Sequence, residues 1–384
     1  SWIPAFVDRI ERMVYRDRNH ASVIMWSLGN EAGYGSNFEH CYAAARRCDM
    51  AAQAISRRPI HYEGTRGGRD FGGEAYSDFY SKMYPGMAWM QKNTSDLDKP
   101  MFICEYAHAM GNAIGNLREY WDYIETSNAC IGGCIWDWVD QAIYDPKEMK
   151  QGIYRLHTGY DYPGPHQGNF CSNGVIPATR HEGAKLKEVK AAHQFVKFGL
   201  KDINAKKNRA TITIYNDYDF TSLNEFNLQY EVVKEGRVVA TRTVKLPAVK
   251  PHDTWTGDIK LPKVALKKAK ANKEEILLNL RLVRRAATVY SEAGHEEALA
   301  QYTLVERGDL PKIEAKGEPI LATSSLHEVM VGNDKVQATF DAETGRLTAL
   351  AFEGRNIIAD GQGFLYDNHR WIENDRYGNT SNGL

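Results

Sequence analysis

Two strand-like runs in this sequence each end at a glutamate. The run "SVIMWSLGNE" passes through apolar residues to Gly29, Asn30 and Glu31, and the run "PMFICEY" leads in the same way to Glu105. A short apolar run closed by glycine is typical of a strand covered on both faces, as in parallel sheets with helices outside. The carboxyl end of such a strand is where α/β barrels carry their active sites. Taken alone, Glu31 is more readily explained as a carboxylate in the first turn of a helix, where an acid interacts favourably with the helix dipole.

The pair of acids is more informative than either one. Two carboxylates that converge from strand ends are what glycoside hydrolysis requires, because one protonates the leaving oxygen and the other attacks or stabilises the sugar. Other chemistries fit less well, since the sequence contains no HExxH, GxSxG, GxxxxGK[ST] or GxGxxG motif. The glycines of "EGTRGGRDFGG" follow a strand-like run but lack dinucleotide-binding spacing.

The first half of the chain alternates strand-like runs with helical or loop stretches, which predicts parallel βα units. The runs are "SVIMWSLGNE", "RPIHYE", "AYSDFY", "PMFICEY" and "IGGCIWDWVD". A closed (β/α)8 barrel needs eight strands, so either the sheet is open or the chain begins inside a barrel. We favour the second interpretation, because the chain starts at an amphipathic helix and stops in an incomplete β-rich region.

Past residue 200 the pattern changes to β-type alternation, with a turn predicted at Glu235–Gly236. The fold class is therefore multidomain, and we predict four segments. Residues 1–196 form the C-terminal part of a catalytic (β/α)8 barrel, and 197–308 an immunoglobulin-like β-sandwich. Residues 309–322 are a linker, and 323–384 begin a further, truncated β-sandwich, in which "TGR" marks a hairpin turn.

Composition excludes some partners. The chain has 384 residues, of which 43% are hydrophobic and 25% charged, and its net charge is −1. This charge predicts no general attraction to nucleic acid or to an anionic membrane surface. No apolar run reaches the roughly 18 residues of a membrane span.

Several blocks together resemble a known family. The blocks "RDRNHASVIMWSLGNEAGYG", "ICEYAHAMGN", "GGCIWDWVDQ" and "NFCSNG" resemble, in order, the signatures of the large bacterial β-galactosidases of glycoside hydrolase family two. The resemblance implies a retaining exo-β-galactosidase that releases terminal β-D-galactose through a covalent galactosyl-enzyme intermediate. In that mechanism Glu31 is the general acid and base, and Glu105 is the nucleophile.

The same resemblance implies several sugar contacts. Asn30 would hydrogen-bond the 2-hydroxyl, and Tyr84, for which Tyr80 is an alternative, would contact the nucleophile. His108 would lie near the 6-hydroxyl, and Trp136 would offer its ring to the apolar face of the sugar. Without the resemblance, a lone histidine and a strand tryptophan are more often core residues.

Cofactors also come only from the resemblance. The Phe170 carbonyl and Asn173 match a sodium site that helps hold the sugar, so Asn173 is also a substrate-binding candidate, and Glu31 matches a magnesium ligand. The family's remaining ligands for both ions have no counterpart in this chain, so the chain is expected to be an internal piece of a longer enzyme that is inactive alone.

Two rival functions stay open. The chain could belong to another exo-acting family-two enzyme, a β-glucuronidase or a β-mannosidase, or it could be a carbohydrate-binding or scaffold module without activity. The sequence is compatible with a homo-oligomer and with either the bacterial cytoplasm or the periplasm.

Overall fold

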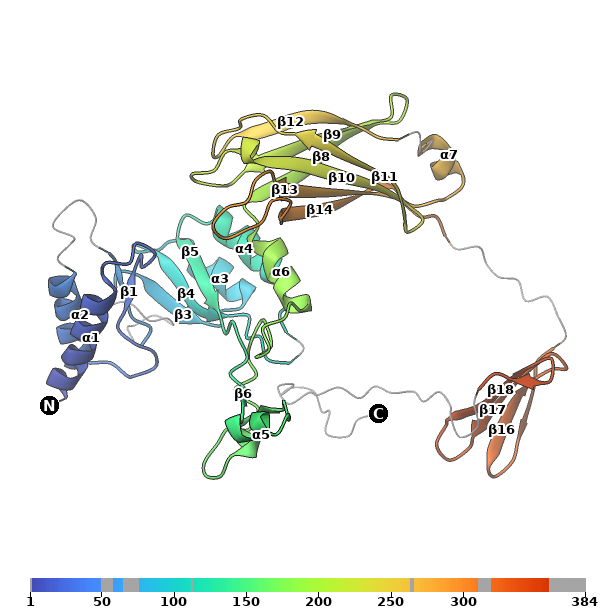
Figure 1. The fold of residues 1–384 in the computed structure, drawn as a ribbon, viewed down its shortest axis with the longest axis horizontal. Helices are drawn as coiled ribbons and strands as arrows, with labels where there is room; N and C mark the ends of the chain where they lie inside the picture. The colour runs from blue at the N-terminus through green and yellow to red at the C-terminus, as the bar shows by residue number, and fades with distance from the viewer. Residues whose placement is uncertain are drawn as a thin grey trace. The chain divides into compact units, whose positions relative to one another are not determined.

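The computed structural model describes residues 2–49, 58–64, 76–111, 113–262, 266–309 and 319–358. The chain divides into two compact units, Ser1–Arg307 and Gly308–Leu384 (Figure 1). Most of the predicted linker 309–322 and the end of the predicted last domain, 359–384, lie outside the described residues.

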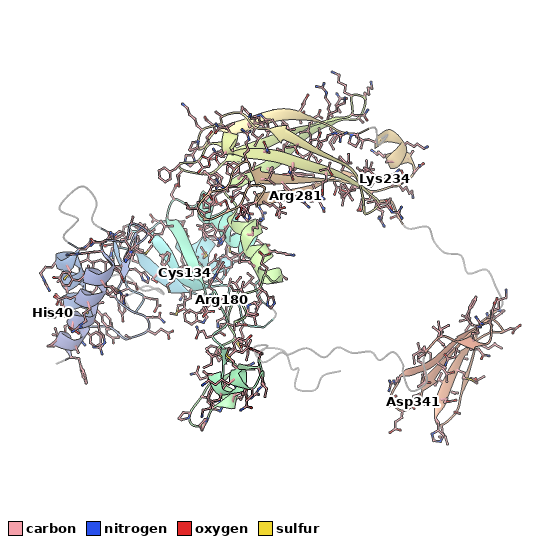
Figure 2. All side chains as sticks on the ribbon, in the orientation of Figure 1. His40, Cys134, Arg180, Lys234, Arg281 and Asp341 are labelled. Atoms are coloured by element: carbon pink, nitrogen blue, oxygen red, sulfur yellow. The ribbon has the colours of Figure 1, made fainter. Side chains whose placement is uncertain are left out.

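The first unit begins with alternating helices and parallel strands, as the sequence predicts. In chain order these are α1 (Ile3–Asp17), β1 (Trp26–Ser27), α2 (Ser36–Cys48), β2 (Ile60–His61), β3 (Tyr80–Met83), α3 (Met87–Asn93), β4 (Met101–Tyr106), α4 (Leu117–Thr126) and β5 (Cys130–Ile135). Strands β1 and β2 pair in parallel, and β3, β4 and β5 form a second parallel sheet, with Cys134 on β5 (Figure 2). The Asp78 amide donates to the Ile60 carbonyl over 2.7 Å, so the chain that enters β3 lies beside β2.

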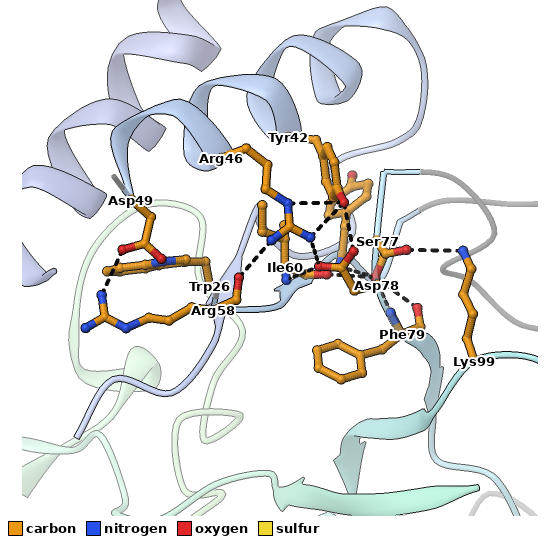
Figure 3. Close-up of polar contacts among 11 residues, drawn as sticks. Trp26, Tyr42, Arg46, Asp49, Arg58, Ile60, Ser77, Asp78, Phe79 and Lys99 are labelled. Atoms are coloured by element: carbon orange, nitrogen blue, oxygen red, sulfur yellow. Dashed lines mark hydrogen bonds and ion pairs between the residues drawn. The ribbon is translucent and has the colours of Figure 1, made fainter. Parts of the chain in front are cut away.

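The third strand starts later than predicted, at the last residue of "AYSDFY". The reason is Asp78, whose carboxylate accepts hydrogen bonds from the Ile60 amide at 2.6 Å and the Tyr42 hydroxyl at 2.7 Å and pairs with Arg46 (Figure 3). These side-chain bonds give the segment before β3 partners other than a strand ladder.

The parallel strands have a helix-covered face and a polar face. Ile60 and Tyr62 are buried in one cluster with residues of α1 and α2, so His61 between them points to the other face. There His61 bridges two strands, with Nδ1 3.0 Å from the Ser27 hydroxyl and Nε2 2.8 Å from the Ser81 hydroxyl. Burial lowers the pKa of His61 to about 4, so the imidazole is neutral at pH 7.

After β5 the chain forms a small polar substructure and then returns to the core. Its elements are β6 (Ile143–Tyr144), α5 (Pro146–Lys150), β7 (Leu156–His157), a 3-10 helix (Gly159–Asp161) and α6 (Ala184–His193). Strands β6 and β7 are antiparallel. Helix α6 buries Val189 and Ala192 in the same cluster as Leu117 and Ile124 of α4. This packing anchors the C-terminal half of α6.

The rest of the first unit consists of two antiparallel sheets around one core. The sheets have strand orders β11-β10-β13-β14 and β12-β9-β8. Their bounds are β8 (Val196–Asn204), β9 (Arg209–Asn216), β10 (Phe226–Lys234), β11 (Arg237–Lys245), β12 (Thr254–Lys260), β13 (Ile276–Arg284) and β14 (Glu296–Val305), with a 3-10 helix (Leu223–Glu225) and α7 (Leu266–Ala271) between strands. Both sheets contribute fully buried residues, such as Ile212 and Leu280, to this core.

The predicted turn at Glu235–Gly236 is confirmed. These two residues join β10 to β11, and both have positive φ angles, 45° and 73°. This is the backbone that two-residue hairpin turns require, and glycine adopts it without steric cost. The immunoglobulin-like topology and the boundaries between the predicted domains stay predictions.

The second unit contains one antiparallel sheet with its strands in sequence order. They are β15 (Leu321–Ser324), β16 (Glu328–Gly332), β17 (Val336–Asp341), β18 (Leu347–Phe352) and β19 (Arg355–Asn356). The predicted "TGR" turn joins β17 to β18, where the Asp341 carboxylate accepts from the Thr344 amide over 2.7 Å. Across all described residues, no helix is both long and apolar enough to cross a bilayer.

Candidate active site

The first predicted acid, Glu31, lies four residues beyond β1, which is shorter than the predicted run and ends at Ser27. Trp26 and Leu28 are buried in the cluster under α1 and α2, and the chain then turns through Gly29, with φ of 141°. Glu31 is exposed and has a φ of 49°, in the left-handed region that non-glycine residues seldom adopt. Asn30 beside it is also exposed. The end of β1 therefore presents an amide and a carboxylate to solvent.

The second acid owes its direction to an irregularity in β4. Ile103 and Tyr106 are fully buried on the helix-covered face, although strict alternation would place residues three apart on opposite faces. The register of β4 shifts against both neighbouring strands at this point. Such a bulge re-aims the side chains within it, and Glu105 is only half-buried.

Tyr84 is the partner of Glu105. Its hydroxyl donates to Glu105 Oε2 over 2.8 Å, and its amide donates to the Glu105 carbonyl over 2.7 Å. Burial, the hydrogen bond and the charges of Glu105 and Glu31 raise the pKa of Tyr84, so the phenol stays protonated. The alternative, Tyr80, is buried and donates to Asp98 over 2.6 Å instead.

Three rings, those of Tyr84, His108 and Phe170, form a row of contacts. The ring centroids of Tyr84 and His108 are 5.9 Å apart, and those of His108 and Phe170 are 5.7 Å apart. Burial lowers the pKa of His108, against the Glu105 and Asp137 charges, which raise it. The structure thus brings together aromatic and polar candidates from segments more than 80 residues apart in sequence.

Trp136 and Asn173 join the same region through the backbone. The Trp136 carbonyl accepts from the Ala109 amide over 2.7 Å, and the Asn173 carbonyl accepts from the Asp137 amide over 2.9 Å. Asn173 is 3% exposed, and its Nδ2 donates to the Phe170 carbonyl over 2.7 Å. The ends of β4 and β5 and the turn around Asn173 therefore form one connected set of loops.

Oxygen atoms are available for a cation in this set. Within the described part of the chain, the Oδ1 atoms of Asp137, Asn169 and Asn173 are buried and lack a hydrogen-bond partner. Uncompensated buried oxygens are costly and are the kind of group that an oxygen-liganded cation satisfies. By contrast, the described residues contain no group of three or more His, Cys, Asp or Glu side chains that could hold a metal.

One residue of this region was missed by the sequence reasoning. Lys185 in the first turn of α6 donates to the carbonyls of Ala109 and Gly174, the latter over 3.3 Å. A lone lysine in a sequence is usually a solvated side chain. Only its position at a helix N-terminus, where the dipole disfavours a cation, could have signalled a specific contact.

The sequence matches two family models. The model described as "Glycosyl hydrolases family 2, TIM barrel domain" matches residues 1–198, and the one described as "Beta-galactosidase, domain 4" matches residues 212–305.

Curated relatives match over almost the whole chain. A "Beta-galactosidase" of Priestia megaterium is 33% identical over 363 residues, which are 94% of this chain and 33% of that protein. "Beta-galactosidase 2" of Enterobacter cloacae is 32% identical, over 90% of this chain and 33% of that protein. The chain thus spans about a third of the length of these relatives.

Solved structures are similar at a lower level. A β-glucuronidase from glycoside hydrolase family 2 has 12% identity and a TM-score of 0.34, over 90% of this chain and 33% of that one. A Bacteroides uniformis β-glucuronidase has 12% identity and a TM-score of 0.32, over 79% of this chain and 36% of that one.

Proposed function

The chain belongs to glycosyl hydrolase family 2, and from this premise we propose that it supplies the catalytic acids of a retaining exo-β-galactosidase. The observation that carries the proposal is the hydrogen bond from Tyr84 to Glu105 at the end of β4, with the charge of Glu31 acting on the same phenol. The names of the curated relatives, at 32–33% identity, support galactosides as the substrate class.

In the proposed mechanism Glu105 is the nucleophile. One of its carboxylate oxygens forms a bond to the anomeric carbon, and the bond from that carbon to the leaving oxygen breaks. The Tyr84 hydroxyl donates a hydrogen bond to Oε2 of the same carboxylate and so holds that oxygen in place. A hydrogen bond to a charged acceptor of this kind orients the nucleophile before reaction.

Glu31 acts in both halves of the reaction. It gives a proton to the departing oxygen, and it then takes a proton from the water that attacks the glycosyl-enzyme. Its exposed position after β1 gives it access to that water. A retaining mechanism predicts that the carboxyl groups of Glu31 and Glu105 lie about 5–5.5 Å apart when substrate is bound, whereas inversion requires roughly 6.5–9.5 Å.

The remaining candidates bind the sugar. We assign Asn30 to the 2-hydroxyl, His108 to the side of the 6-hydroxyl, and the half-buried Trp136 to an apolar face of the ring. We place Asn173 on the same side as His108, because the Phe170 ring packs on His108 and the Phe170 carbonyl accepts from Asn173 Nδ2. The connected backbone of these loops supports that grouping, because Asn173 and Trp136 are both tied to neighbouring residues of the β4 and β5 ends.

The two ions differ in how well the residues present fit them. The Phe170 carbonyl and the unsatisfied Asn173 Oδ1 fit a sodium ion, which would help hold the sugar. Glu31 does not make a magnesium site with the other described residues, so its role as a magnesium ligand stays a prediction, and no step depends on it.

The test is a substrate panel on the full-length gene product that carries this chain. We expect para-nitrophenyl β-galactoside to be cleaved far faster than the β-glucuronide and β-mannoside, with the β-anomer of galactose as the first product by NMR. The Glu105→Gln variant should be inactive, and a 2-fluoro-galactosyl trap should label Glu105. A preference for glucuronide or mannoside would select the rival enzymes, and sugar binding without cleavage would select the binding module.

A further inference from the structure

Lys185 connects two loops that carry proposed sugar-binding residues. Its ammonium group donates to the carbonyl of Ala109, which directly follows His108, and to the carbonyl of Gly174, which directly follows Asn173. The helix that carries Lys185 is anchored in the core by Val189 and Ala192. The ammonium group thus extends from a fixed element to both loops.

The Lys185 ammonium group makes specific contacts in a partly buried position. Burial lowers the pKa of Lys185, while the charge of Asp140 raises it. The Asp140 carboxylate also accepts from the Gly174 amide over 2.7 Å, so the same short segment is held from both sides. A solvated lysine would instead place its charged end in water and keep only its stem on the protein.

The two loops are also connected through the end of β5 and by a ring contact. The Ala109 amide donates to the Trp136 carbonyl, the Asp137 amide donates to the Asn173 carbonyl, and the His108 and Phe170 rings pack together. Lys185 therefore closes a ring of contacts that runs from the β4 loop through the end of β5 to the Asn173 turn. Removal of the Lys185 ammonium group would break one contact of this ring and leave the other contacts in place.

We propose that Lys185 is a positioning residue that sets the separation of His108 and Asn173, and thereby the binding of the hydroxymethyl group of the sugar. The inference rests on the proposed function, in which those two residues face the 6-hydroxyl. Lys185 touches neither the substrate nor the reacting atoms. Its effect is confined to substrates that carry the hydroxymethyl group.

The experiment compares two substrates that differ only in that group. Para-nitrophenyl α-L-arabinopyranoside has the ring of the β-D-galactopyranoside but lacks the hydroxymethyl group. In the full-length gene product, Lys185→Met should lower kcat/KM for the galactoside about tenfold, mainly through KM, since a charge-assisted hydrogen bond is lost. The arabinopyranoside should lose less than about twofold, so the ratio of the two kcat/KM values falls.

Controls separate this role from a merely structural one. Lys187→Met, at an exposed position of the same helix, should leave the ratio unchanged. A folded Lys185→Met protein that loses equal activity on both substrates, or none, overturns the inference. If Lys185→Met does not fold, Lys185→Arg decides, because its different reach should still lower the ratio about threefold, and an unchanged ratio overturns the inference. A wild-type protein that cleaves neither substrate overturns the proposed function and the inference with it.

Discussion

At the scale of single residues, Glu31 is the proposed group whose loss is easiest to diagnose. Glu31→Gln keeps the shape of the side chain but removes the transferable proton. In the full-length gene product we expect kcat to fall by roughly 10²–10⁴ on galactosides with poor leaving groups and much less on activated nitrophenyl galactosides. Steady-state kinetics on both substrate types checks this. Equal losses on both would argue against Glu31 as the acid.

His61 gives a prediction about stability and pH. Its pKa is about 4 in the folded chain and about 6.5 in an unfolded one, so the unfolded state binds more protons between these values. The contribution of His61 to stability is therefore complete above pH 6.5 and decreases as the pH falls to 4, by up to about 3 kcal/mol. Urea unfolding of the wild type at pH 7 and pH 4.5 should show this decrease.

A non-titrating variant isolates the His61 contribution. His61→Gln should flatten the decrease in the free energy of unfolding between pH 7 and pH 4.5. The matched control is His40→Gln, the same substitution at a histidine exposed on α2 (Figure 2), against which the change caused by His61→Gln is measured. If His61→Gln keeps the wild-type slope, the buried histidine is not its source.

At the scale of elements, the close approach of β4 and β5 depends on Gly133. A Cβ atom there would lie 2.8 Å from the Ile103 carbonyl oxygen and 2.9 Å from Ile103 Cβ. Gly133→Ala should therefore destabilise the first unit by about 1–3 kcal/mol, as overpacking does. Thermal unfolding measures this loss of stability. Gly86→Ala is the control, because a Cβ atom at Gly86 would meet nothing within 4 Å. Equal stability of the two variants would show that the strands can separate at no cost.

The sequence predicts elements better than it predicts their irregularities. Short apolar runs were sufficient to predict β4 and β5, and turn chemistry was sufficient for Glu235–Gly236, because both signals are local. The bulge that turns Glu105 is invisible in the sequence, since it depends on the register of β4 against two other strands. The late start of β3 was missed for a similar reason, because Asp78 meets partners from α2 and β2.

The candidate site shows the same division. The two glutamates could be proposed from strand patterns, and the other candidates came only from the resemblance. Tyr84 could be distinguished from Tyr80 only when the structure showed which hydroxyl reaches Glu105 and which reaches Asp98. Lys185 had no sequence signal of comparable strength, because its contacts are backbone carbonyls, which any residue carries.

At the scale of the whole molecule, the described part of the chain contains five parallel strands, β1 to β5, before its antiparallel sheets. A closed barrel of this family type uses eight. We therefore expect residues 1–384, purified free of host enzyme, to hydrolyse para-nitrophenyl β-galactoside poorly or not at all. The full-length gene product is the positive control. Near-normal turnover by the 384-residue chain would contradict this expectation.

The sheet of the second unit has a practical consequence for handling the chain. Among its described residues Ile358 alone is buried, while Leu321, Leu326 and Phe352 are 70%, 92% and 53% exposed. Exposed apolar side chains gathered on one small described unit favour self-association. In light scattering, the 384-residue chain should form particles that grow more steeply with concentration than those of a chain that ends at Arg307. If the chain that ends at Arg307 associates more strongly, the self-associating surface lies in the first unit.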